Sequence, residues 1–118
     1  MMRPSHDELA VYLCREPVDM RKSIDGLSLL VEQGLGLDPF APQLYVFCNR
    51  ARDKVKLLYW ERNGFCLWYK RLEKARFRWP RMAGETVKLS GRELNWLLDG
   101  LDLERMQGHE RLDYRRVA

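Results

Sequence analysis

Apolar residues along this chain alternate with polar ones in several short runs and recur at helical spacing in two longer ones. The short runs are rich in β-branched and aromatic residues, and turn-forming residues separate them, which predicts strands. The predicted strands are residues 9–15, 43–50, 54–61, 65–72, 75–80 and 87–90. In residues 75–80, two aromatic residues alternate with arginines, the pattern of a half-buried strand with one basic face, and Pro80 suggests an edge strand or a strand end.

The first predicted helix spans residues 19–33. Apolar positions recur three or four residues apart, which is typical of an amphipathic helix. They are Met20, Ile24, Leu27 and Val31. Asp19 is placed to cap the amino-terminal end, and Gly34 to stop the helix.

The second predicted helix covers residues 91–100. Ser90 and Glu93 stand at the spacing of a capping box. An apolar stripe follows at Leu94, Leu97, Leu98 and Leu101. Gly100 is a natural end for this helix.

Asn63-Gly64 lies between two β-rich runs and predicts a two-residue hairpin turn. With Arg62 opposite Phe65, Lys56 would lie opposite Arg71. Like charges in that position cost a few tenths to about 1 kcal/mol. A bound anion would offset this cost, or both side chains could reach water or a carboxylate.

Each face of this hairpin carries apolar residues, so both faces are expected to be covered. The first helix would cover one face, and other chain segments or a partner the other. At 118 residues the chain has room for one core. We therefore predict a single α+β domain over residues 1–102, with a mostly antiparallel sheet of four to six strands, a central hairpin and two packed helices. The charged residues 103–118 are expected to form a mobile tail.

Charge is distributed unevenly. The net charge is +4, yet residues 43–82 hold eleven Lys and Arg against three carboxylates, leaving −4 for the remainder. Nine of the thirteen aromatic residues fall in the same stretch. Concentrated positive charge attracts polyanions, and exposed rings can stack on bases. The purely structural alternative is that the aromatic rings belong to the hydrophobic core and the cations form a solvent-exposed face.

The candidate nucleic-acid contacts are Arg50, Arg52, Lys54, Lys56, Lys70, Arg71, Lys74, Arg76 and Arg78. Arg21 and Lys22 are possible secondary contacts, because a helix amino terminus with adjacent cations suits a phosphate. Capping and local ion pairing explain these two equally well.

No residue pattern indicates catalysis. Gly-rich phosphate loops, G-x-S-x-G and C-x-x-C are absent from the sequence, and His6 and His109 lack metal-ligand spacing. Three widely spaced cysteines favour reduced, buried thiols in a cytosol. With no apolar run long enough for a membrane span and no export signal, we expect a cytoplasmic protein without catalytic residues, metal or cofactor.

Three blocks of the sequence are familiar. VDMRKSIDGL at 18–27, the stretch from YVFCNR to RFRWP at 45–80, and VKLSGRELNWLLDGLD at 87–102 resemble TnpB, the Orf2-like accessory protein of the sixty-six family of insertion sequences. That family is unrelated to the RNA-guided nuclease of the same name. Ala75 stands where its members often have Gly.

The resemblance implies a bacterial, non-enzymatic accessory factor for DNA transposition that acts beside a separate DDE transposase. Its partners would be DNA at the element ends, transposase subunits, or both. Taken with the charge pattern, this suggests DNA binding through a basic, aromatic-rich sheet. The alternative is a protein–protein assembly module that docks the transposase without touching DNA.

Overall fold

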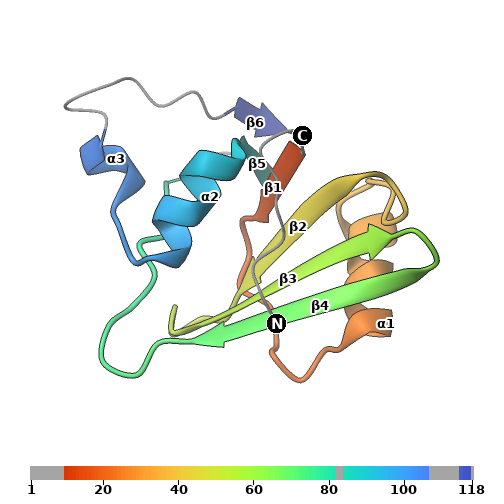
Figure 1. Cartoon of the computed structure of the whole chain (residues 1–118), viewed down its shortest axis with the longest axis horizontal. Coiled ribbons are helices and arrows are strands. Elements are labelled where there is room, and N and C mark those ends of the chain that lie inside the picture. The colour runs from red at the N-terminus through yellow and green to blue at the C-terminus, as the bar shows by residue number, and fades with distance from the viewer. Residues whose placement is uncertain (1–9, 82–83, 107–114, 118) are drawn as a thin grey trace.

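One mixed sheet organises the chain in the computed structural model, which describes residues 10–81, 84–106 and 115–117 (Figure 1). The strands are β1 (Ala10–Cys14), β2 (Gln43–Cys48), β3 (Lys54–Glu61), β4 (Gly64–Arg71), β5 (Thr86–Leu89) and the three-residue β6 (Arg115–Val117). Their order across the sheet is β4-β3-β2-β1-β5-β6. Only the β1–β2 pair is parallel among these described strands. The predicted α+β class and mostly antiparallel sheet are confirmed.

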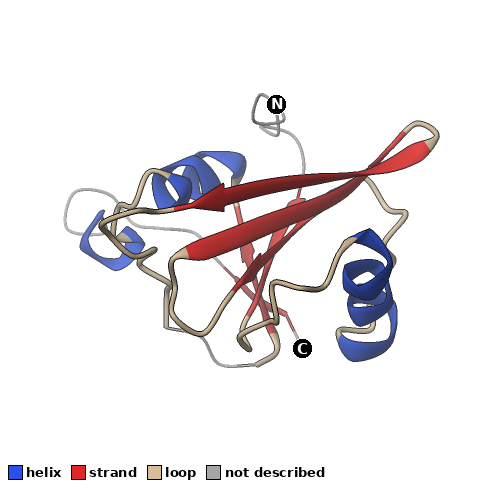
Figure 2. Ribbon diagram, turned by 90° about the horizontal axis from the view of Figure 1, so that it is seen from below, coloured by secondary structure: helices blue, strands red, loops and turns tan. Residues whose placement is uncertain are grey.

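The parallel pair has a structural cause. Parallel neighbours need a long crossover connection, and here that connection contains α1 (Ile24–Leu29) and the π-helical turn η1 (Leu30–Gly34). This crossover helix covers one face of the sheet (Figure 2). Leu27 and Val31 are fully buried there against Tyr45, Phe47 and Leu58.

The opposite face is covered by α2 (Gly91–Leu98) and α3 (Leu103–Met106). Its apolar core includes Leu57 and Trp68 from the hairpin, Leu94 from α2 and Phe77 from the chain after β4. The expectation that both hairpin faces are covered is therefore confirmed, and chain segments cover both of them.

The hairpin turn differs from the prediction. Glu61 pairs with Gly64, so the loop is Arg62-Asn63, and Arg62 takes the positive φ of 52°. Lys56 consequently lies opposite Tyr69, and the expected Lys56–Arg71 pair is wrong.

The change of register leaves each residue on its predicted face, because the displacement is two residues along the strand. Lys54, rather than Lys56, lies opposite Arg71. Trp60 now faces Phe65, and their rings meet edge to face at 5.0 Å. Phe40 adds a third ring 5.0 Å from Trp60, so packing from a distant loop accompanies this register.

The first helix begins at Ile24, five residues later than predicted, and Ser23 occupies the N-cap. Asp19 does not cap it; its carboxylate accepts hydrogen bonds from the backbone N–H and guanidinium of Arg21. The predicted end holds, since η1 ends at Gly34. The capping box of the second helix is confirmed, with Ser90 and Glu93 each bonded to the other's backbone.

The strand predicted over residues 75–80 is wrong. This segment joins no strand ladder; it wraps around the turn between β2 and β3, where the Phe77 N–H donates to the Arg52 carbonyl at 2.7 Å. The Trp79 indole N–H donates to the Cys14 carbonyl at 3.3 Å. The alternating sequence still turns the Phe77 and Trp79 rings inward and the arginines outward, although the segment pairs with no strand.

The chain after residue 102 has some defined structure. Leu103 is fully buried at the start of α3, and β6 pairs with β5. Residues 107–114 lie outside the described residues, so mobility there stays a prediction.

Candidate nucleic-acid interface

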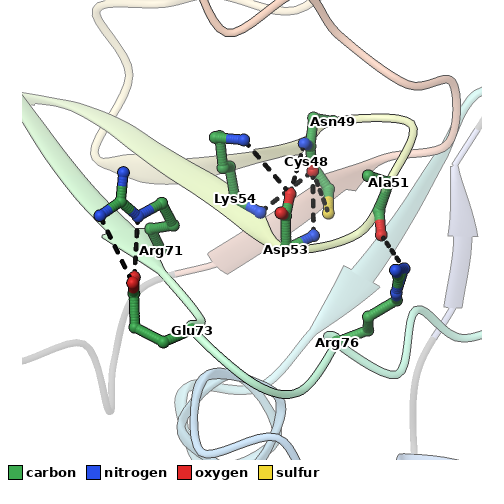
Figure 3. A network of polar contacts seen from close by, with 8 residues as sticks. All are labelled: Cys48, Asn49, Ala51, Asp53, Lys54, Arg71, Glu73 and Arg76. Carbon is green, nitrogen blue, oxygen red and sulfur yellow. Dashed lines mark hydrogen bonds and ion pairs between the residues drawn. The ribbon is translucent and has the colours of Figure 1, made fainter.

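The turn between β2 and β3, residues 49–54, is held by one asparagine side chain. Asn49 Oδ1 accepts from the Asp53 and Lys54 N–H groups at 3.1 and 3.0 Å, and Asn49 Nδ2 donates to Asp53 Oδ1 at 2.7 Å (Figure 3). The hydrogen bond from Asn49, together with nearby Lys54, lowers the pKa of Asp53. A left-handed Arg52, at φ 62°, lets the chain reverse here. These hydrogen bonds give the turn a fixed backbone conformation, and with it fix the positions from which its cations extend.

The segment after β4 packs alongside the 49–54 turn. The Leu72 N–H donates to the Asp53 carbonyl at 2.8 Å. Arg76 Nη1 donates to the Ala51 carbonyl at 3.3 Å (Figure 3). Phe77 anchors the segment because its side chain is buried in the core. As a result, cations that lie some twenty residues apart in sequence share one end of the sheet.

The cations at this end lie on the 49–54 turn, at the end of β4 and on the segment after it. We call them the basic end: Arg50, Lys54, Arg71, Lys74, Arg76 and Arg78. All are exposed except Lys54, which is half-buried. Two carboxylates reduce their charge: Arg71 pairs with Glu73 at 2.8 Å and Lys54 with Asp53 at 3.5 Å.

Lys56 and Lys70 do not belong to this surface. Lys56 Nζ donates to the carbonyls of Met20 and Lys22 at 2.7 and 2.9 Å, which ties the chain before α1 to the sheet. Lys70 Nζ donates to the Leu98 carbonyl at 2.8 Å, at the carboxyl end of α2. The two ammonium groups therefore lie on opposite sides of the sheet and serve the fold.

Arg52 also points into the structure. Its guanidinium carbon lies 5.3 Å from the centre of the Trp79 ring, a cation–π contact, and its Nη1 atom is buried. Burial raises the pKa of the nearby Cys48 thiol, while the Arg52 guanidinium acts in the opposite direction. Arg52 is thus half-buried beneath the basic end.

A groove of about 710 Å³ separates the 49–54 turn from residues 17–21. Arg21, Arg50 and Lys54 line it, together with Asp19 and Tyr69. This groove joins Arg21, one of the two secondary candidates, to the basic end. Arg21 is paired with Asp19 at 2.7 Å, and this hydrogen-bonded guanidinium lowers the pKa of Asp19 to about 2.

Lys22, the other secondary candidate, is exposed beside α1 and is not among the residues that line the groove. Sequence reasoning missed Tyr69, whose side chain is 48% exposed in the groove. The available signal was its position on the hairpin face shared with Lys56 and Arg71.

Fold and site together define a small α+β protein with a basic surface at one end of its sheet. Among the described residues there is no cluster of His, Cys, Asp or Glu that could hold a metal ion. The same residues contain no helix long and apolar enough to cross a membrane.

Residues 9–108 match the family model described as IS66 Orf2 like protein, and the chain belongs to this family. It is 35% identical to "Uncharacterized protein y4hO" of Sinorhizobium fredii (strain NBRC 101917 / NGR234) over 86% of this chain and 88% of the relative. It is 32% identical to "Uncharacterized protein y4jC" of the same organism over 91% of each. No solved structure matches the chain. The resemblance noted from the sequence is confirmed, and the protein is an accessory protein of insertion sequences.

Proposed function

We propose that this accessory protein assists transposition without catalysing it, and that its basic end contacts DNA. The observation that supports this is the convergence of the 49–54 turn and the segment after β4. With Arg21 across the groove, seven cations stand against the three carboxylates Asp19, Asp53 and Glu73, a net charge of +4. A phosphodiester backbone would satisfy these cations and release its counterions.

The groove adds a second element to this proposal. Tyr69 offers a half-exposed ring between cations, and an unpaired base stacked on such a ring gains about 1 to 3 kcal/mol. Arg21 is poised to exchange its exposed carboxylate partner for a phosphate. Exposed ion pairs contribute little to stability, so this exchange costs little.

A salt series tests the proposal. Fluorescence anisotropy with labelled duplex and single-stranded DNA from an element end should show affinity that falls steeply with salt. The combined variant Arg50→Ala, Lys74→Ala, Arg76→Ala and Arg78→Ala should lower the slope of log K against log salt by about 3 to 4, since each lost phosphate contact removes about 0.9 on a duplex.

Arg62→Ala is the matched control, because Arg62 is an exposed cation on the hairpin loop at the other end of β3. It should leave the slope unchanged. Undetectable binding of the wild-type protein to both kinds of DNA at low salt would refute the proposal. So would a loss of slope in Arg62→Ala as large as the loss per substituted cation in the combined variant.

The alternative function, docking the DDE transposase without DNA contact, has its own supporting observation. Leu29 and Phe40 are each more than half exposed, well away from the basic end. This alternative predicts that transposase co-purifies with the protein although no DNA binding is detected.

A further inference from the structure

Large apolar side chains gather at the end of the hairpin opposite the basic end. They come from α1, the loop before β2, and the tip of the β3–β4 hairpin. We call them the aromatic end: Leu29, Phe40, Trp60 and Phe65. Phe40 lies 5.0 Å from Trp60 and 5.2 Å from Phe65, measured between ring centres.

Two of these side chains remain substantially open to water, whereas Trp60 and Phe65 are half-buried. Leu29 is 52% exposed and Phe40 is 53% exposed. Single exposed apolar residues are ordinary, but a patch assembled from three chain segments is typical of an interaction site. Leu29 contributes nothing to the core, because α1 packs through Leu27 on its other side.

A groove of about 360 Å³ runs beside this patch, between α1–η1 and the loop before β2. Leu29, Pro39 and Phe40 line it on the apolar side, and Asp25 and Glu32 on the charged side. Asp38 stands next to it and fixes the loop, since its carboxylate accepts from the Phe40 N–H at 2.9 Å.

The groove is acidic as well as apolar, because its lining contains two carboxylates and no Lys or Arg. Carboxylates repel phosphate, so this groove is unsuited to DNA. The basic end of a second copy offers many cations but a single half-exposed ring, Tyr69, because Phe77 and Trp79 are buried or turned inward. That surface carries little apolar area with which to cover both Leu29 and Phe40.

We propose that the aromatic end binds a short segment of a partner protein that carries large apolar side chains next to Lys or Arg. The apolar side chains would cover Leu29 and Phe40, and the cations would meet Asp25 and Glu32. This is the general mode in which an amphipathic helix lies in an apolar groove, with charge fixing its orientation.

This binding surface is separate from the basic end. The eight residues of β3 place the two ends about 25 Å apart at the usual rise of a strand. The segment and DNA could therefore be bound at the same time, and either proposal can fail without the other.

The test is a selection on the purified full-length chain. A display library of random peptides is selected on the wild-type protein and counter-selected on Phe40→Ser. Enriched peptides should combine at least two large apolar residues with Lys or Arg. As synthetic labelled peptides, they should bind wild type at least about tenfold more tightly than Phe40→Ser.

Glu32→Lys provides a second variant, because Glu32 is exposed and its change leaves the apolar core intact. This substitution should weaken the binding of the same peptides several-fold, and the loss of affinity should shrink as the salt concentration rises. Circular dichroism and the urea midpoint of each variant establish that it is folded.

Three results would overturn the proposal. The first is no enrichment over the counter-selection. The second is enrichment of acidic peptides, or of peptides whose affinity Glu32→Lys leaves unchanged. The third is a wild-type dimer in sedimentation velocity that Phe40→Ser dissociates, because the aromatic end would then be an interface between copies of this chain.

Discussion

Two lysines of the hairpin strands and two cations of the segment after β4 have different roles in this protein. Lys56 and Lys70 lie in β3 and β4, and each donates to backbone carbonyls of a distant segment. Lys74 and Arg78 lie on the segment after β4 and extend into solvent. Residues of the same type, close in sequence, thus stabilise the fold in one place and form a charged surface in the other.

The difference shows why a count of positive charges overstates a binding surface. A strand fixes where its side chains point, so a lysine there meets whatever packs on that face. On the segment after β4 the aromatic side chains turn inward, and Lys74 and Arg78 keep their long side chains in water. Measurements of stability and of salt dependence should therefore separate the two groups.

The largest stability effect is expected for Lys56→Met, which keeps the apolar stem and removes the ammonium group. Two carbonyls, of Met20 and Lys22, lose their donor. Because hydrogen bonds from charged groups contribute about 1.5 to 3 kcal/mol, the free energy of unfolding should fall by about 2 to 3 kcal/mol. Urea denaturation measures this change.

Lys74→Met is the matched control for the strand lysines. Lys74 is exposed, so its substitution should change stability by less than about 0.5 kcal/mol. Equal losses in Lys56→Met and Lys74→Met would remove the distinction between the two groups.

A smaller effect is expected for Lys70→Met, which removes a single donor from the Leu98 carbonyl. The free energy of unfolding should fall by about 1 to 2 kcal/mol. Because this carbonyl lies at the end of α2, amide hydrogen exchange should quicken there before it does in β3. Uniform exchange across the molecule would contradict a local role for this lysine.

The smallest effect concerns the ion pair of Asp19 with Arg21. The pKa of the Asp19 carboxyl in the folded state, about 2, lies below the ordinary value of 3.8. The pair's contribution to stability is therefore fully present above pH 3.8 and is lost as the pH falls through about 2.

Carboxyl titration by NMR tests this prediction. Arg21→Ala should return the midpoint of Asp19 toward 3.8, since the hydrogen-bonded guanidinium is the largest cause of the shift. A wild-type midpoint already at 3.8 would show that Arg21 is not held by Asp19 and faces the groove without a partner.

Much of the fold could be predicted because it depends on neighbours in the sequence. Strand positions follow from alternation, the second helix from Ser90 and Glu93, and the two hairpin faces from the period of two. The end of the first helix at Gly34 was predicted for the same reason.

Other features depend on residues far apart in the chain. The first helix begins at Ile24 rather than at Asp19, and Lys56 from β3 donates to the carbonyls of Met20 and Lys22 just before it. The segment around Phe77 reads as a strand from its alternation, but its hydrogen bond goes to the 49–54 turn. No local pattern indicates either partner.

The candidate site was predicted in part. The sequence located the cluster of cations between Arg50 and Arg78, and the structure divides it. Lys56, Lys70 and Arg52 are directed toward carbonyls or a ring. Arg21, which the sequence suggested only as a secondary contact, lines the groove beside Arg50.

By itself the sequence determined the α+β class and the segment that carries the positive charge, because composition and short-range periodicity encode them. It also indicated the family, through the resemblance of three blocks of residues to its members. Only the tertiary structure decided which cations reach solvent, how the hairpin pairs, and that an acidic, aromatic surface forms at the opposite end. Those outcomes depend on contacts between segments tens of residues apart. Such contacts form only when the sheet has assembled and the helices have packed on its two faces.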